Sequence, residues 1–270
     1  MRSKGTLSAN TLFHFTNSSD KLEGILRNEF HPKYCLENWD ILNAKGLREI
    51  AIPMVSFCDI PLSQIGKHVK YYGRYALGLT KEWGMEKNIS PVLYTHKKAK
   101  LSFHLRNIFA EALRTAADPK EDEFSELLQH VLNFIKFLKP YRGKLWRDAK
   151  YLVQEVTFYD EREWRFCPDI PFSKKQKEDE PRCFLGKREL LRGDKQELLL
   201  GETIENENKK LERYKLSFEP KDIKYIIVDK DDERLEMVRK ITEIKRKYSY
   251  EDLQILTTRI LSMDNIFEDF

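Results

Sequence analysis

The sequence has few cysteines and none of the spacings that bind zinc. Only four of its 270 residues are cysteine, with no Cys-x-x-Cys pair and no histidine at zinc-finger distance. We interpret them as reduced, buried thiols and expect neither disulfides nor a metal. With 41% hydrophobic and 12% aromatic residues, the chain can bury a core without such links. The four are Cys35, Cys58, Cys167 and Cys183.

Long apolar runs are also missing. No stretch approaches the roughly 20 apolar residues that cross a bilayer, and the basic N-terminus lacks the apolar core of a signal peptide. We therefore expect a cytoplasmic protein with no membrane partner. The net charge of +4 is spread among interspersed acidic and basic residues, so it permits a nucleic-acid partner without arguing for one.

Several catalytic motifs are absent. The sequence has no Walker A loop, no Gly-x-Gly-x-x-Gly after a strand, no His-Glu-x-x-His and no Gly-x-Ser-x-Gly. These absences exclude most nucleotide hydrolases, dehydrogenases, metalloproteases and serine esterases.

What the sequence contains is a mixture of short strands and amphipathic helices. We expect a single α+β domain over residues 1–270, with a helical hairpin inserted at about 97–150 and helices at the C-terminal end. Residues 30–50 lack periodicity and are predicted as a long excursion, and the polar stretch at 202–213 as a loop. Strands are expected at 11–16, 54–60, 75–79, 92–94, 152–159, 164–167 and 225–228; helices are expected near 63–72, 105–116, 124–138, 235–241 and 253–260.

The first candidate site lies in the strand at 11–16, where His14 and Thr16 share one face because side chains alternate along a strand. A polar pair flanked by aromatic residues is a candidate binding site. The alternative is structural: a half-buried histidine in an edge strand that donates to a backbone carbonyl.

The second candidate site is the acidic motif at 161–165, in which Glu161, Glu163 and Arg165 alternate on one face. Two carboxylates this close repel, so one pKa should rise unless Arg162 or Arg165 compensates. Such a carboxylate could stabilise a cationic intermediate or act as a general base. The alternative is a solvated ladder of Glu and Arg on an exposed strand.

Taken in order, the segments resemble the AbiGi family of phage-abortive-infection proteins. The resemblance includes Leu-Phe-His-Phe-Thr at 12–16, Glu-Arg-Glu-Trp-Arg at 161–165, and segments 55–61, 72–79, 91–94 and 222–228. The opening His-Phe-Thr followed by a helix also resembles DarT-type ADP-ribosyltransferases, which modify nucleic acid. That likeness implies a split β-sheet core and NAD as a substrate.

The second resemblance also implies roles for named residues. His14 and Thr16 would hold the NAD ribose, and Glu163, as the second carboxylate after Glu161, would be catalytic. The stacking aromatic is left open. The strand at 54–60 offers Ser56 and Phe57, whereas Tyr72 and Tyr75 lie further along. The alternative for Tyr72 is an ordinary core position. Arg74 or Arg165 could neutralise the pyrophosphate, and the 30–50 segment, with Tyr34 and Trp39, could contact the acceptor.

Two functional hypotheses follow from these resemblances. The first is an NAD-dependent ADP-ribosyltransferase that modifies RNA or DNA, serves as the toxin of a phage-defence toxin–antitoxin system and needs a neutralising antitoxin protein. The alternative is a non-catalytic AbiGi-type antitoxin, a binding protein that keeps the fold without the activity. The presence of both a His and a Glu favours the enzyme. A nucleic-acid-cutting toxin is a weaker third hypothesis, because no nuclease constellation stands out.

Overall fold

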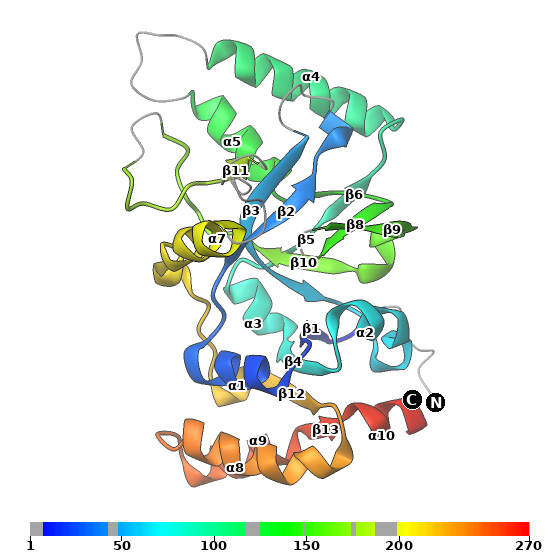
Figure 1. Ribbon diagram of the computed structural model, residues 1–270, viewed down its shortest axis with the longest axis vertical. Coiled ribbons are helices and arrows are strands. Elements are labelled where there is room, and N and C mark those ends of the chain that lie inside the picture. Colours follow the sequence, from blue (N-terminus) through cyan, green and yellow to red (C-terminus); the bar gives the residue numbers. More distant parts are fainter. Residues whose placement is uncertain are drawn as a thin grey trace.

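The computed structural model describes residues 8–42, 48–116, 125–147, 150–173, 177–186 and 199–269. It is an α+β protein whose central sheet has helices on both faces (Figure 1). In that sheet the strands β12 and β13 run parallel, and the other neighbours are antiparallel. The spatial order is β13 (Ile260–Ser262), β12 (Ile223–Val228), β4 (Tyr75–Thr80), β1 (Thr11–Thr16), β3 (Glu49–Cys58), β10 (Glu163–Phe166) and β5 (Ser90–Pro91).

The long strand β3 changes partners along its length. Its first half pairs with β2 (Lys33–Asn38) and β11 (Leu185–Gly186), whereas its second half pairs with β10. It meets β1 at Cys58 and Phe13, while all six residues of β1 pair with β4. The sheet therefore divides beyond this contact, and the divergence leaves room for side chains from both strands.

The predicted excursion at 30–50 is wrong where β2 lies, because all six residues of β2 are paired with β3. Its sequence, Lys-Tyr-Cys-Leu-Glu-Asn, lacks the apolar alternation of a half-buried strand. Tyr34 and Trp39 are 7% and 1% exposed. Rings buried to this degree cannot stack on a nucleic-acid base, so the predicted contact with an acceptor does not fit the structure.

Alternation along the strands gives the sheet two apolar faces. Leu12 and Leu77 face a core covered by α1 (Ser19–Asn28), α8 (Arg234–Ile244) and α9 (Tyr250–Thr258). Phe13 and Ala76 face the opposite core, under α2 (Gly66–Tyr72) and α10 (Met263–Asp269). A strand covered on both faces is held on each side by apolar burial, so β1 is firmly positioned.

The segment predicted as a helical insertion contains α4 (Lys100–Thr115) and α5 (Glu126–Ile135), which cover the first half of β3. It also contains β7 (Leu138–Pro140), which pairs in parallel with β6 (Leu93–Thr95) just before the segment, and β8 (Gly143–Arg147), which forms a hairpin with β9 (Lys150–Val156) at its end. Residues 117–124 and 148–149 of this segment lie outside the described residues. The single-domain organisation stays a prediction.

The helix α3 (Lys81–Glu86) follows β4, and α7 (Leu199–Lys209) occupies most of the stretch predicted as a polar loop. The loop prediction is wrong there, because α7 packs Ile204 against the core beside β2 and so takes its stability from that contact. Within the described ranges, none of the helices is long and apolar enough to span a membrane.

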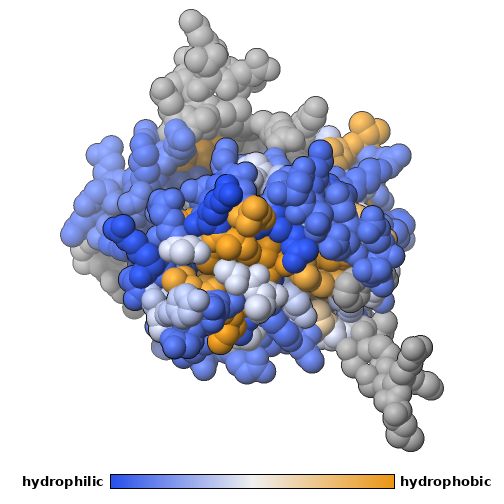
Figure 2. Space-filling view, turned by 90° about the horizontal axis from the view of Figure 1, so that it is seen from below, coloured by the Kyte–Doolittle hydropathy of each residue, from blue (hydrophilic) through white to orange (hydrophobic). Residues whose placement is uncertain are grey.

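The layer of α8, α9, β13 and α10 lies at the bottom of Figure 1. Seen from below, this face has apolar residues gathered in its middle within a ring of hydrophilic ones (Figure 2). Exposed apolar side chains on the three helices include Leu235, Ile255 and Phe267, which are 62%, 48% and 47% exposed.

Gly73 links α2 to β4 through a backbone conformation that favours glycine. Its φ is +104°, and a Cβ atom built there would lie 2.3 Å from the Thr16 carbonyl oxygen. The absence of a side chain therefore lets the end of α2 approach the end of β1. Gly24 in α1 is the opposite case, since a Cβ atom there would meet nothing within 4 Å.

We expect Gly73→Ala to lower the free energy of unfolding by about 3 kcal/mol, because it combines a strained φ with a backbone clash. The matched control Gly24→Ala should raise it by about 0.5–1 kcal/mol through helix propensity. Urea denaturation followed by circular dichroism measures both values. Equal stability of Gly73→Ala and the parent would contradict this account of the turn.

Candidate functional site

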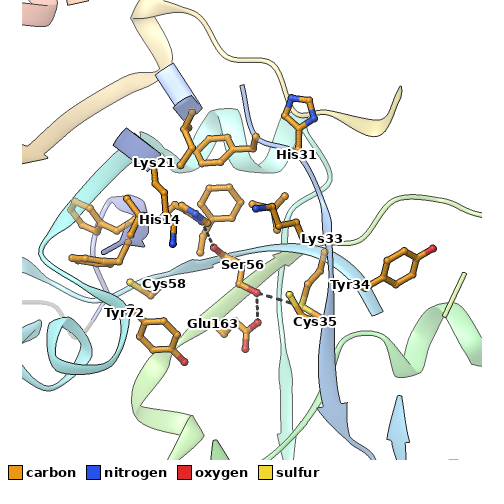
Figure 3. A pocket seen from close by; sticks show the side chains of 18 of the residues that line it. His14, Lys21, His31, Lys33, Tyr34, Cys35, Ser56, Cys58, Tyr72 and Glu163 are labelled. Atoms are coloured by element: carbon orange, nitrogen blue, oxygen red, sulfur yellow. Dashed lines mark hydrogen bonds between the residues drawn. The ribbon is translucent and has the colours of Figure 1, made fainter. Parts of the chain in front are cut away.

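A cavity of about 1280 Å³ opens where β1 and β3 diverge. Its walls come from α1, β1, β2, β3, β7, β8 and the short helix η3 (Phe158–Glu161) before β10. Figure 3 shows side chains from several of these elements pointing into one space. Seven of the nine predicted site residues line it: His14, Thr16, Ser56, Phe57, Tyr72, Glu161 and Glu163.

Arg74 and Tyr75 lie elsewhere. Arg74 forms ion pairs with Asp229 and Asp264, the latter at 2.5 Å, and the hydroxyl of Tyr75 donates to Glu233 at 3.1 Å. All three carboxylates belong to the C-terminal part of the chain, toward which the chain turns after Gly73. The predicted roles of Arg74 on a pyrophosphate and of Tyr75 as a stacking ring do not fit these positions.

His14 is held as a neutral ring inside the sheet. Its Nδ1 lies 2.8 Å from the carbonyl oxygen of Ser56, and since a carbonyl can only accept, Nδ1 carries the hydrogen. Burial lowers the pKa of His14, with a smaller lowering effect from the charge of Lys33. This contact is the structural alternative anticipated for His14, except that β1 lies between β3 and β4 and is not an edge strand.

Ser56 stands between the two residues predicted to be catalytic. The register of β3 and β10 places Arg165 opposite Ser56 and Glu163 opposite Cys58, so these side chains share one face. The Ser56 hydroxyl donates to Glu163 Oε1 at 2.7 Å, while its carbonyl accepts from His14. His14 and Glu163 thus line the same cavity and are connected through Ser56.

The Glu163 carboxylate is buried and paired with two cations. Its Oε2 lies 2.5 Å from Lys139 Nζ, and its Oε1 lies 2.6 Å from Arg165 Nε. Burial alone would raise the pKa of Glu163, but the charges and hydrogen bonds of these two partners outweigh it and hold that pKa well below its usual range. Arg165 is completely buried, so the alternative of a solvated Glu/Arg ladder is wrong.

Glu161 accepts from the same lysine. Lys139 Nζ lies 2.8 Å from Glu161 Oε2, and the Tyr72 hydroxyl donates to Oε1 at 2.6 Å. The Tyr72 ring stacks on His68 with centroids 4.3 Å apart. Burial, helped by the Lys139 charge, lowers the pKa of His68 to about 3. Tyr72 is therefore held at the cavity wall by a carboxylate and is not an ordinary core residue.

Arg165 brings a third carboxylate into the cluster. It donates to Glu37 Oε1 at 2.8 Å and to the Lys136 carbonyl at 2.9 Å. Burial raises the pKa of Glu37 despite this contact. Glu37, Glu161 and Glu163 together exceed the two cations, Lys139 and Arg165, by one charge.

Sequence reasoning missed Lys139 and Glu37. Neither lies in a motif, since Lys139 follows a helix and Glu37 sits in the stretch read as aperiodic. The one usable signal is that Lys136 lies within, and Lys139 directly after, the mostly apolar run at 131–138, because a lysine in such a run needs a buried partner.

The pairing limits what the carboxylates can do. Both oxygens of Glu163 already accept from cations or from Ser56, so the carboxylate has little uncompensated negative charge to offer a developing cation. The cluster as described is a set of satisfied ion pairs, and its clearest effect is to fix β3, β7 and β10 against one another.

A family model described as "abortive phage resistance protein AbiGi, antitoxin" matches residues 28–229 of the chain. The chain belongs to the AbiGi family. The Lactococcus lactis subsp. cremoris protein named "Abortive phage resistance protein AbiGi" is 29% identical over 260 residues, covering 89% of this chain and 99% of that protein. No solved structure matches the chain. The AbiGi resemblance seen in the sequence is thus confirmed.

The family description corrects the functional prediction. It names an antitoxin, which contradicts the hypothesis of an NAD-dependent ADP-ribosyltransferase toxin and agrees with the alternative. The expectation of a neutralising antitoxin as partner falls with the toxin hypothesis. Binding of NAD or of a nucleic acid stays a prediction.

We expect Glu163→Gln to lower the free energy of unfolding by about 3 kcal/mol, since it leaves Lys139 and Arg165 buried without their shared counter-charge. Adding Lys139→Met should recover part of the loss. The control Glu155→Gln breaks the pair with Arg142, whose side chains are 63% (Arg142) and 54% (Glu155) exposed, and should cost less than about 0.5 kcal/mol. If Glu163→Gln and Glu155→Gln cost the same in chemical denaturation, the buried cluster does not hold the fold together.

Stability should fall as the pH drops below about 6.5, the usual pKa of an exposed histidine. The pKa values of His14 and His68 are lowered in the folded state, so the unfolded state takes up protons first and is favoured as pH falls. The contribution of Glu163 is lost only below about pH 4.3. Urea denaturation midpoints in buffers at about pH 7.5, 6.5 and 5.5 measure this loss of stability.

His68→Phe keeps a ring against Tyr72 and removes one titrating group, so its midpoint should change less with pH than that of the parent. The control His130→Phe alters a side chain on α5 that is 74% exposed. Its denaturation midpoint should change with pH as much as that of the parent. A parent whose stability is constant from pH 7.5 to 5.5 would show that neither buried ring is held neutral.

Proposed function

We propose that this chain is a non-catalytic antitoxin of an abortive-infection system, which acts by binding a toxin protein. The observation that carries the proposal is the family description as an antitoxin, over a match that spans most of the chain. The Lactococcus relative, named as an abortive phage resistance protein, supports the same setting in phage defence.

The geometry of the acidic cluster supports a binding role. Catalysis by a carboxylate on a cationic transition state needs negative charge that is free to act there. Glu163 is instead neutralised by Lys139 and Arg165, at 2.5 and 2.6 Å. His14 likewise directs its N–H into a backbone carbonyl. The two residues therefore serve the framework of the cavity wall.

The surface supports a protein partner. Exposed apolar patches on a folded protein mark interaction sites more often than chance, and the lower face seen in Figure 2 carries such a patch over α8, α9 and α10. A toxin is the partner that the antitoxin assignment implies. We place both proteins in the cytoplasm, where an intracellular toxin would have to be held.

We also propose that the sheet retains the split arrangement of an ADP-ribosyltransferase-like core. The support is the single meeting point of β1 and β3, after which the two strands diverge around the cavity. On this view the chain keeps an enzyme's framework while its charged residues have become structural.

Expression of the chain alone in bacteria tests the function. We expect normal growth for the parent and for Glu163→Gln, since an antitoxin harms nothing by itself. Each gene flanking the coding sequence is then expressed with and without the chain. The product of one of these genes should arrest growth when it is expressed alone. The chain should relieve that arrest and copurify with the gene product.

Growth arrest by the parent chain alone would overturn the proposal. If that arrest disappeared in a Glu163→Gln variant that circular dichroism shows to be folded, the carboxylate would be catalytic. If the chain relieved growth arrest by a flanking toxin without forming a complex with it, the binding mechanism would be overturned.

A further inference from the structure

One end of the cavity is unusually basic. The residues that line the whole cavity include eight lysines and arginines but five glutamates. Four of the lysines gather where α1 and α8 end: Lys33, Lys215, Lys245 and Lys247. We call these four the basic corner. Figure 3 shows Lys33 reaching from β2 into the cavity toward His14, and the lowering of the pKa of His14 by the Lys33 charge agrees with that direction.

Three of the four ammonium groups have no counter-charge in contact. Lys215 pairs with Glu29 at 2.8 Å. The ammonium groups of Lys33, Lys245 and Lys247 make no hydrogen bond and no ion pair with any residue in the described ranges. Lysines on an open surface commonly have no partner, because water solvates them. Lys33 and Lys247 are exposed, so water solvates them. Lys245 is buried in the cavity wall, where part of that solvent is excluded.

Lys245 is the decisive member, because it is only 6% exposed. Its Nζ lies 4.9 Å from the centre of the Phe218 ring and 5.9 Å from that of Tyr248. Cation–π contacts offset part of the cost of burying an ammonium group, but they supply no hydrogen-bond acceptor, so its N–H donors are left to the water or ligand in the cavity. An anion in the cavity would meet them.

The dipoles of the neighbouring helices do not neutralise the excess positive charge of the basic corner. Both α1 and α8 end at this corner, and each C-terminus carries about half a negative charge. Together they offset about one of the three unpaired ammonium charges. The remaining positive charge faces the cavity, where a low-dielectric wall strengthens its action on an anion.

The chain is also strained here. Glu29, the residue that ends α1, has φ of 71° and ψ of −175°, a combination found almost only in glycine. It is held there by the pairing of Phe30 with Leu216, through N–H···O bonds of 3.2 and 2.8 Å. This pairing turns the chain so that Lys33 and Lys215 lie on the same cavity wall. Strained residues of this kind cluster at ligand sites.

The volume and the aromatic lining of the cavity indicate which class of anion it would bind. The cavity exceeds the roughly 300–1000 Å³ of typical small-molecule sites. Trp146, Tyr151, Phe158 and Tyr248 line it together with the basic corner. Flat rings and phosphate-binding cations along one cavity suit a nucleotide, whose base packs on rings and whose phosphates meet ammonium groups.

We propose that the cavity binds a nucleotide that carries two or more phosphates, with Lys33 and Lys245 contacting the phosphates. The site needs no catalysis, and it stands independently of the antitoxin function. A small ligand fits better than a nucleic-acid strand, because Lys245 is enclosed and the surface charge of the chain is mixed.

Isothermal titration calorimetry of the full chain with ATP, adenosine and inorganic pyrophosphate tests the proposal. ATP should bind, and the other two should each bind at least about tenfold more weakly, because each lacks half of the recognised groups. Lys245→Met and Lys33→Met should each weaken ATP binding by about tenfold. The control Lys67→Met removes the same charge from an exposed position of α2 outside the cavity and should leave the affinity unchanged.

The stability of the ligand-free variant separates a binding role from a structural one. Lys245→Met should be as stable as the parent or more so, because it removes a buried charge without a partner. If it unfolds readily, and Lys33→Met binds ATP like the parent, the corner is structural and the proposal fails. Binding of adenosine or pyrophosphate as tightly as ATP would also overturn it. So would binding of single-stranded oligothymidine without binding of ATP.

Discussion

The arrangement of the sheet depends on one buried guanidinium group. Arg165 is fully enclosed and donates to Glu163, to Glu37 and to the carbonyl of Lys136, and so joins β10, β2 and the end of α5. A buried charge costs several kcal/mol unless all its partners are in place. These segments therefore have to assemble together. A slip of β10 by one residue would turn Arg165 and Glu163 to the face of Trp164, where apolar side chains pack, so the ion pairs also specify the register.

Much of the framework could be predicted from local pattern. The strand at 11–16 has the observed bounds of β1, because an aromatic and aliphatic alternation ends in a Ser/Asn/Asp cluster that begins α1. The segments for which the prediction was wrong lack such a pattern. β2 is stabilised by its pairing with β3, and α7 by packing of a few apolar residues in a polar stretch. Leu138 continues the helical spacing of α5, yet it lies in β7, because pairing with β6 outweighs the spacing.

The site was predictable in part. Strand alternation placed Glu163 and Arg165 on one face, and seven of the nine candidate residues line one cavity. The partners that decide its chemistry come from distant positions. Lys139 lies 24 residues before Glu163, and no local motif connects the two. The family was therefore recognisable from residue types, whereas the activity was misjudged, since the same carboxylate is reactive or inert depending on which cations neutralise it.

The strand order brings together segments that are far apart in the sequence. β1 is flanked by β4, which pairs with β12, and the edge strand β13 comes from residues 260–262. A nascent chain emerging from the ribosome cannot complete this sheet until residues 223–262 have been synthesised, because they form β12 and β13. Pairing between such distant segments also slows folding. Newly made molecules thus pass through an interval in which proteases and chaperones compete with folding, and the cellular level of the protein would respond quickly to changes in either.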